Sequence, residues 1–573
     1  MQSKTLFLTL LAASLSACAQ MPEGVSGPQA APSVVLAKSA ADVLPEPVPF
    51  TPQLMYQFLL GEIAGQRGEL RLSAEAYADL AARTRDVRVA RRATELALYA
   101  RQGGLALRNA RLWLELEPDS AKAKQTLASL LVGAGQLAEA RPYLERWLQS
   151  GAPEQVFMQL HSLFARTTDR QAVAALVSDL AAAYPALAEA RFAVGQAAWQ
   201  AGQGGNALSA LDDALRLKPE WEHAALFRAQ ILQQKESDAA AIDFLESYLK
   251  ARPGAAAVRM AYAKQLARVG RLEESRQSFA LLAEAEPTNP EPHFALGLVA
   301  MQANELDTAR EAFLKALELD YPEPSVLRYY LGQIAEAQGG LEQALDWYKS
   351  VGGAQTFDAG LRVGMVLGRM GRMDEARNWL SGLTSGNEAQ AVRLVQAEAE
   401  LLRDAKRYEE AFQVFDAALT RHVDSLDLLY DRAMVAEKLG RLDVLERDLR
   451  RMIQLKPDYA HAYNALGYTL ADRTDRLKEA IQLLEKAIGL APDDPFIQDS
   501  MGWALYKAKR YPEAAVYLRK AHAARPDPEI AAHLGEVLWV LGEKEEAQRI
   551  WQGGLKSFPD NESLRETLSR LVP

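Results

Sequence analysis

The sequence predicts an all-α fold, a superhelical solenoid of about fifteen helix–turn–helix units. Three observations lead to this prediction. A pattern of apolar and small residues recurs about every 34 residues from residue 53 onward. Each repeat carries two apolar stripes at i, i+3, i+4 and i+7 spacing, which indicates two amphipathic helices. Glycine, alanine and proline recur at fixed places within the repeat.

Composition limits the classes of function that are open to the chain. Its 573 residues carry a formal net charge of -10, and 49% of them are hydrophobic. Such a chain can bury a core. The acidic balance argues against nucleic acid as a partner, because phosphates favour a basic surface. The single cysteine excludes an internal disulfide framework and a zinc–thiolate cluster.

Residues 1–17 have the pattern of a secretory signal peptide. Lys4 supplies a positive charge, and an apolar run of about ten residues follows it from Leu6 to Leu15. This run is too short to span a bilayer, because a transmembrane helix needs roughly 20 apolar residues. We therefore expect a cleaved leader rather than a membrane-spanning helix.

Cys18 is the expected site of lipid attachment. The stretch Leu15-Ser16-Ala17-Cys18 resembles the lipobox of bacterial lipoproteins. The resemblance implies that the leader is cut before Cys18 and that this residue is acylated, since several acyl chains give stable anchoring. Ala19-Gln20 lacks the aspartate that commonly retains such proteins in the inner membrane. The implied location is the periplasmic face of the outer membrane. The alternative is an ordinary signal peptide with an incidental cysteine.

Residues 18–52 contain the lipidated cysteine and a predicted flexible tether. The segment is rich in proline and alanine, and no apolar period is sustained along it. Repeated prolines also remove amide donors that a helix or strand would need. Fully extended at about 3.1 Å per residue, the tether would reach on the order of 100 Å.

Residues 53–561 contain the predicted repeat array. In the repeat 495–528, Gly502 and Ala514 occupy the eighth and twentieth positions. Small residues there allow the two helices of a pair to approach closely, whereas a larger side chain would overpack the contact by about 1–3 kcal/mol. The clearest repeats are 188–221, 290–323, 460–494, 495–528 and 528–561, and those around 154–187, 222–255 and 357–391 are degenerate.

The array resembles the tetratricopeptide repeat family, whose signature is a 34-residue helix–turn–helix. The resemblance covers nearly all of residues 53–561, and residues 562–573 are similar to the helix that covers the last repeat of such arrays. It implies an inner groove lined by the first helix of every pair. Binding along that groove, rather than chemistry, is the function that the family implies.

Aromatic residues on the implied groove are the candidate partner-binding residues. In this family, positions two, five, nine, twelve and thirteen of a repeat face the concave side. Rings on a concave, partly desolvated surface are typical of binding hot spots. The candidates are Phe192, Trp199, Phe294, Tyr329, Tyr468, Phe496, Trp503, Tyr506 and Trp539. The alternative is that the rings pack between repeats. We expect packing between repeats for an isolated ring. For the group Phe496, Trp503, Tyr506 and Trp539 we expect contact with a partner.

The sequence contains none of the common motifs of catalytic or metal sites. Its histidines are scattered along the array, at His161, His223, His293, His422, His461, His522 and His533. We therefore expect no catalytic residue, metal, cofactor or small-molecule substrate. Enzyme activity is not expected either.

A lipid anchor, a tether and a long repeat array together predict a scaffold at the outer membrane that faces the periplasm. This layout resembles bacterial adaptor lipoproteins of the NlpI and LbcA type. The resemblance implies two kinds of partner, a periplasmic carboxy-terminal processing protease and the cell-wall hydrolases that it degrades. Partners on one scaffold meet at an effective concentration that can reach about millimolar. The alternative function is an assembly scaffold for envelope export, either of exopolysaccharide or through a pilus secretin.

Overall fold

A computed structural model describes residues 51–572 of the chain. It contains thirty-one α-helices and one short 3-10 helix, and no strand occurs among these residues. The prediction of an all-α solenoid of about fifteen helix pairs is confirmed. The predicted leader 1–17, Cys18 and nearly all of the tether 18–52 lie outside the described residues.

The described residues divide into two compact halves, residues 51–321 and 322–572. The N-terminal half contains α2 (Pro52–Gln66), α3 (Leu70–Thr84), α4 (Val87–Tyr99), α5 (Gly103–Leu116), α6 (Ala121–Gly133), α7 (Leu137–Ser150), α8 (Pro153–Phe164), α9 (Arg170–Ala182), α10 (Ala188–Gln200), α11 (Gly204–Leu217), α12 (Glu222–Lys235), α13 (Asp238–Ala251), α14 (Ala256–Arg268), α15 (Leu272–Ala285), α16 (Pro290–Gln302) and α17 (Leu306–Glu318). The C-terminal half contains α18 (Pro324–Ala337), α19 (Leu341–Lys349), η1 (Gly353–Gln355), α20 (Thr356–Arg369), α21 (Met373–Ser381), α22 (Glu388–Asp404), α23 (Tyr408–Leu419), α24 (Leu426–Lys438), α25 (Leu442–Leu455), α26 (Ala460–Arg473), α27 (Leu477–Leu490), α28 (Pro495–Lys507), α29 (Tyr511–Ala524), α30 (Pro528–Leu541), α31 (Lys544–Ser557) and α32 (Glu562–Leu571).

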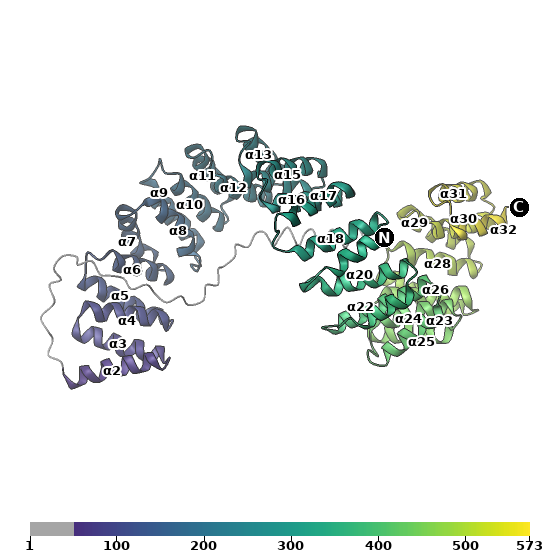
Figure 1. The fold of residues 1–573 in the computed structure, drawn as a ribbon, viewed down its shortest axis with the longest axis horizontal. Helices are drawn as coiled ribbons and strands as arrows, with labels where there is room; N and C mark the ends of the chain where they lie inside the picture. Colours follow the sequence, from purple (N-terminus) through teal and green to yellow (C-terminus); the bar gives the residue numbers. More distant parts are fainter. Residues whose placement is uncertain (1–50, 573) are drawn as a thin grey trace. The chain divides into compact units, whose positions relative to one another are not determined.

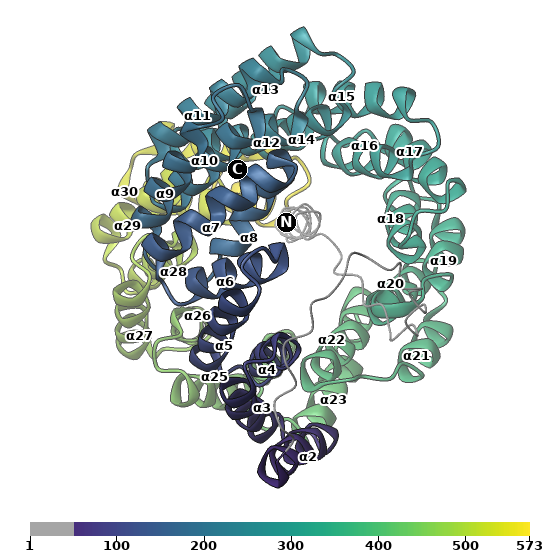
Figure 2. The ribbon, with the colours of Figure 1, turned by 90° about the vertical axis from the view of Figure 1, so that its left-hand side faces the viewer.

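Within each half the helices stack in chain order as antiparallel pairs (Figure 1). The even-numbered helix is the first of each pair and the odd-numbered helix is the second. In the N-terminal half, α10, α12 and α14 lie on the concave side, with α9, α11 and α13 outside them (Figure 2). In the C-terminal half, α18, α20 and α22 lie on the concave side, with α19, α21 and α23 outside (Figure 2).

Local sequence signals set the beginnings of the helices and the turns between them. Asp494 caps α28 by accepting hydrogen bonds from the backbone N–H groups of Phe496 and Ile497, at 2.9 and 3.2 Å. Pro495 follows at the first helical position, where its missing N–H costs nothing. Between α20 and α21, Gly371 has a φ of +77°, a conformation that glycine adopts without steric cost.

The two helices of a pair approach closely where the first helix carries glycine at the eighth position. A Cβ on Gly502 would lie 2.5 Å from Leu518 Cγ and 3.2 Å from the carbonyl oxygen of Ala514. The same contact occurs in the first described pair, where a Cβ on Gly61 would lie 2.7 Å from the Tyr77 ring. The predicted role of this glycine is therefore confirmed.

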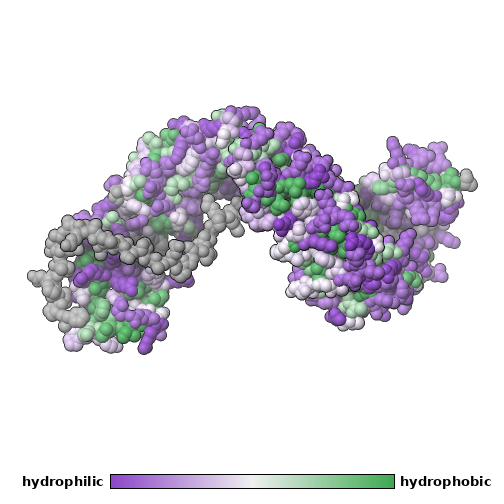
Figure 3. Space-filling model, viewed as in Figure 1, coloured by the Kyte–Doolittle hydropathy of each residue, from purple (hydrophilic) through white to green (hydrophobic). Residues whose placement is uncertain are grey.

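The first helices are more deeply buried than the second helices. In α28 all residues from 497 to 505 are buried, because α28 packs against the preceding pair, its own partner α29 and the following pair. In α29 only Ala514, Ala515, Leu518 and Ala521 are buried. The face of the molecule drawn in Figure 3 is largely hydrophilic, and in the C-terminal half the buried apolar residues from Val392 to Leu564 form one core cluster.

Ion pairs link neighbouring pairs on the outer side. Arg476, which precedes α27, contacts Glu446 of α25 and Glu479 of α27, each at 2.7 Å. Arg450 contacts Glu446 at 2.7 Å and also contacts Glu479. The hydrogen bonds from Arg476, supported by Arg450, lower the pKa of Glu446 to about 2. The Glu446 carboxylate therefore stabilises the stacking of two repeats only while it is charged.

The glycine contact predicts opposite effects for two Gly→Ala substitutions in neighbouring repeats. Gly502→Ala should destabilise the pair α28–α29 by about 1–3 kcal/mol, because the new Cβ cannot be accommodated. Gly489→Ala, on the exposed side of α27 with open space around it, should stabilise by about 0.5–1 kcal/mol. Urea unfolding with hydrogen exchange of each helix pair measures both effects. Equal stability of the two variants would contradict the packing role of Gly502.

The Glu446 network predicts a pH-dependent loss of stability in Glu446→Gln. The folded carboxylate has a lower pKa than the unfolded one, so its stabilisation is present above about pH 4.5 and is lost as pH falls toward about 2. At pH 7 the variant should be less stable by about 1 kcal/mol, a figure reduced for solvent screening. This gap should close at low pH in urea unfolding curves. Glu485→Gln, an exposed carboxylate on α27, serves as the control. A gap that is constant from pH 7 to pH 2 would contradict the assignment.

Candidate partner-binding face on α26, α28 and α30

Five of the nine predicted rings lie on three successive first helices of the C-terminal half. Tyr468 is on α26, Phe496, Trp503 and Tyr506 are on α28, and Trp539 is on α30. The structure brings some of these rings together with acidic and basic side chains. We call this set, which consists of Tyr468, Asp472, Asp499, Trp503, Tyr506, Lys507, His533, Glu536 and Arg570, the aromatic–acid cluster.

Trp503 is the centre of the aromatic–acid cluster. Its ring stacks on His533, with centroids 4.2 Å apart, and on Tyr506, with centroids 5.1 Å apart. Its indole Nε1 donates a hydrogen bond to Asp472 Oδ1 at 3.0 Å. Lys507 Nζ lies 3.3 Å from the same oxygen. Burial opposes the charge of Asp472, but the contacts with Trp503 and Lys507 outweigh it and lower the pKa of this carboxyl. Trp503 therefore joins α26, α28 and α30.

His533 and Asp499 form a second link between α28 and α30. His533 Nδ1 lies 3.0 Å from both carboxylate oxygens of Asp499, which is itself buried. Burial is the largest single effect and opposes the charge of the imidazole. The Asp499 carboxylate, with Glu529 and Glu536 farther away, outweighs burial and raises the pKa of His533. The pair therefore favours a protonated imidazole that donates to Asp499.

The terminal helix contributes the third link. Tyr506 donates a hydrogen bond from its hydroxyl to Glu536 Oε1 at 2.8 Å. Arg570 of α32 donates to Glu536 Oε2 at 2.5 Å. Burial and the Glu536 carboxylate raise the pKa of Tyr506. Glu536 is buried, and its charge is compensated by the Tyr506 hydroxyl at one oxygen and by Arg570 at the other.

The aromatic–acid cluster is suited to fixing helices rather than to catalysis. Each of its acids contacts a base or a hydrogen-bond donor, as described above for Asp472, Asp499 and Glu536. Breaking a buried ion pair of this kind is costly, because it leaves one charge buried without a partner. Trp503 itself is only 9% exposed. The expectation that Trp503 presents a free ring to a partner is therefore corrected, because its faces and its N–H are occupied within the chain.

Phe496 and Trp539 have their own neighbours, so the expected group of four rings is divided. Phe496 remains 44% exposed, and the Arg525 guanidinium lies 4.9 Å from its ring centroid. Trp539 is half-buried against Trp551, with ring centroids 5.8 Å apart, and Lys544 Nζ lies 4.9 Å from its ring. These two rings keep a surface that a partner can reach.

The predicted rings elsewhere are mostly packing residues. Phe192 is fully buried, 4.8 Å from the Trp221 ring, and Phe294 is buried and stacks on Tyr321 at 4.6 Å. Phe192 and Phe294 both stand at the fifth position of a repeat, and each packs on an aromatic residue near the end of the same repeat. The prediction that they line an accessible groove is wrong for this reason. Two further predicted rings are half-buried: Tyr329 lies 5.7 Å from Tyr348, and Trp199 packs beside the Phe192 core.

Sequence reasoning missed the charged members of the aromatic–acid cluster. Asp499 stands at position five, and Asp472 and Lys507 stand at position thirteen, which are positions that the family places on the concave side. Choosing only aromatic residue types at these positions left the charged ones out. His533 stands at position six, and no signal within its own repeat indicates its contact with Asp499.

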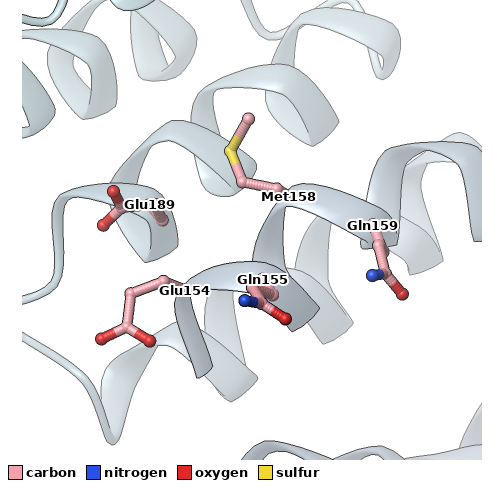
Figure 4. A pocket seen from close by; sticks show the side chains of 5 residues that line it. All are labelled: Glu154, Gln155, Met158, Gln159 and Glu189. Carbon is pink, nitrogen blue, oxygen red and sulfur yellow. The ribbon is translucent and has the colours of Figure 1, made fainter. Parts of the chain in front are cut away.

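One shallow hollow lies in the N-terminal half. Glu154, Gln155, Met158 and Gln159 of α8 line it together with Glu189 of α10 (Figure 4). Glu189 already pairs with Lys218 at 3.1 Å. In the part of the chain that the structure describes, no group of three or more histidine, cysteine or acidic side chains could hold a metal ion. None of the described helices is long and apolar enough to cross a membrane.

Comparisons with known proteins agree with the observed architecture. The family model described as "Tetratricopeptide repeat" matches residues 195–256, 294–358, 430–495 and 500–561. The "TPR repeat-containing protein PA4667" of Pseudomonas aeruginosa is 36% identical over 527 residues, which cover 91% of this chain and 89% of that protein.

Two further similarities are more distant. The "Cellulose synthase 2 operon protein C" of Komagataeibacter xylinus is 25% identical over 282 residues, which cover 48% of this chain and 20% of that protein. The crystal structure of a tetratricopeptide repeat protein from Parabacteroides merdae is 17% identical with a TM-score of 0.35, and the match covers 50% of this chain and 99% of that one. The repeat-by-repeat match and the full-length relative together identify the chain, which belongs to the tetratricopeptide repeat family.

Proposed function

We propose that this protein is a lipid-anchored periplasmic adaptor of the outer membrane, which binds a carboxy-terminal processing protease and brings it together with cell-wall hydrolases for degradation. The observation that supports this most is a combination. The sole cysteine lies in the lipobox-like stretch at residues 15–18. The described part of the chain is an array of tetratricopeptide repeats, a fold that binds other proteins. The nature of the two partners rests on the resemblance to adaptor lipoproteins of the NlpI and LbcA type.

The physical basis of such an adaptor is proximity. A protease and its substrate that bind to one chain encounter each other at an effective concentration of up to about millimolar. An anchor confines that encounter to one membrane surface. The array needs no chemistry of its own for this role, and a solenoid supplies a long surface on which two proteins can bind at once.

Phe496, which is exposed, and Trp539, which is half-buried, are the candidate contact residues. Each ring has a cation beside it, Arg525 and Lys544 respectively. An exposed ring suits a partner segment that presents an apolar side chain, and Lys544 beside Trp539 suits an acidic group in that segment. The aromatic–acid cluster between them would act as rigid support, because its own groups are already paired.

The proposal is tested with the mature soluble chain, without residues 1–17 and with Cys18→Ser, immobilised and exposed to an envelope extract of the cells that produce it. Mass spectrometry should identify a carboxy-terminal processing protease and a peptidoglycan hydrolase among the retained proteins, and Phe496→Ala should weaken binding of at least one purified partner about tenfold. Truncating an accessible ring removes contact area without disturbing the core.

A matched variant separates contact from general damage. Phe558 follows α31 and is 42% exposed, so Phe558→Ala removes the same side chain from a comparably exposed site. It should leave both affinities unchanged, and both variants should melt at the temperature of the parent chain. Retention of neither partner class would refute the adaptor proposal. Equal affinity of Phe496→Ala and the parent for every retained partner would remove Phe496 from the binding surface.

The anchor predicts a separate outcome in cells. Cys18→Ser in the full chain should move the protein from the membrane fraction to the soluble periplasmic fraction, because no residue is then available for acylation. Binding of purified partners should not change, since Cys18 precedes the array by more than thirty residues. Membrane association that persists in this variant would contradict lipid anchoring at Cys18.

An export scaffold is the second candidate function. The similarity to the cellulose synthase operon protein over 282 residues favours it, although that match covers only a fifth of the relative. The same retention experiment distinguishes the two functions. Retention of an outer-membrane channel or a polysaccharide-export protein, in place of protease and hydrolase, would support the export scaffold.

A further inference from the structure

One of the three links in the aromatic–acid cluster contains a histidine. In the other two, Asp472 pairs with Lys507, and Glu536 pairs with Arg570. Lysine and arginine side chains ordinarily keep their charge up to about pH 10. Histidine is the side chain that ordinarily changes its charge between about pH 5 and pH 8. The link made by His533 of α30 is therefore the one that can respond to pH near neutrality.

His533 and Asp499 are largely removed from water where α30 packs on α28. Their side chains are 14% and 10% exposed. His533 Nδ1 lies 3.0 Å from both carboxylate oxygens of Asp499, and no other group in the described part of the chain donates a hydrogen bond to this carboxylate. Trp503 stacks on the imidazole, with ring centroids 4.2 Å apart. The buried charge of Asp499 thus depends on one residue for its compensation.

The groups that surround His533 favour its protonated form. Asp499 faces it from α28, Glu529 and Glu536 lie on its own helix, and the Tyr468 ring of α26 lies 6.5 Å away between centroids. α32 contributes the guanidinium that pairs with Glu536. α29 and α31 also pack against α30, and the residues that these two helices bury are apolar. Burial opposes the charge of the imidazole, but the three carboxylates outweigh it and raise the pKa of His533.

The raised pKa of His533 determines the direction in which the link responds to pH. The protonated imidazole stabilises the folded chain fully below the ordinary histidine pKa of about 6.5. This stabilisation is lost as the pH rises through the higher pKa of the folded state. A neutral imidazole donates an uncharged hydrogen bond, which is about half as strong as a charged one. Asp499 would then remain buried without an opposite charge beside it.

The position of α30 makes it sensitive to the loss of one link. α30 packs against α28 and α29, and within the described residues only α31 and α32 follow it (Figure 1). In a repeat array each unit contacts only its neighbours, so a unit at the end is held from one side. Such units open locally at a lower cost in free energy than the units inside the array.

We propose that His533 and Asp499 form a pH-sensitive link, which holds α30, α31 and α32 on α28 while the imidazole is protonated and lets them open more often once the proton is lost. The other two links stay charged, so the response is a local opening of the last repeat and not unfolding of the half. The link acts in the chain itself and does not depend on the partners proposed above.

Two measurements test the link on the mature soluble chain, without residues 1–17 and with Cys18→Ser, as the pH is raised from about 5.5 to about 9. NMR of the histidine side chains, with the His533 signal assigned by its loss in His533→Gln, should show that His533 releases its proton above the ordinary value of about 6.5. Hydrogen exchange, expressed as protection relative to an unstructured peptide at the same pH, should fall about tenfold in α30 over the range in which His533 titrates. Protection of α24 should stay constant.

Asp499→Asn separates the charge of the link from its packing, because it keeps the imidazole and its stacking on Trp503. Without the nearest carboxylate, burial of His533 is opposed only by Glu529 and Glu536, so this histidine should release its proton at a lower pH than in the parent chain. Protection of α30 should then be nearly constant from about pH 6 to about pH 8.5. His461→Gln, which changes an exposed histidine on α26, is the matched control and should leave the behaviour of His533 and α30 unchanged.

Four results would overturn the proposal. His533 could release its proton at or below the ordinary histidine value, or could keep it up to about pH 9, so that no response occurs near neutrality. Protection of α30 could stay constant while His533 titrates. A fall in protection that persists unchanged in Asp499→Asn would assign the opening of α30 to another titratable group.

Discussion

The close approach of two helices at one glycine is the constraint on which the rest of the structure depends. At Gly502 the backbone of α28 lies so near Leu518 and Ala514 that no Cβ fits. This contact limits the distance between the helices of a pair, and the position holds a small residue in most first helices, either glycine as at Gly467 and Gly535 or alanine as at Ala433. A single small residue per repeat thereby determines how much surface each first helix can bury.

That constraint also explains why the acidic side chains of the aromatic–acid cluster are paired. First helices packed on both sides leave little room, so Asp472, Asp499 and Glu536 are at least partly removed from water. Each must then have a partner from another helix, and Lys507, His533 and Arg570 fill this role. The resulting links join α26, α28, α30 and α32, whereas Phe496 of α28 remains 44% exposed.

The fold was predictable because its signals repeat. The expected repeat starts at 188, 290, 460, 495 and 528 coincide with the beginnings of α10, α16, α26, α28 and α30. The fate of individual side chains was less predictable, because it depends on contacts that one repeat's pattern does not contain. Phe192 packs on Trp221, which stands at the end of the same repeat. His533 contacts Asp499, which precedes it by 34 residues and belongs to the preceding repeat. Position within a repeat assigned each ring to the first helix of its pair, but it could not show which residues that helix uses in its own packing.

The ends of the array follow from the same packing rule. A first helix has two sides to bury, and inside the array both are supplied by neighbours. At the C-terminal end α32 supplies one side and presents charge to water. At the other end α2 exposes Tyr56, Leu59 and Ile63, at the repeat positions that α28 buries with Ile497, Ser500 and Ala504.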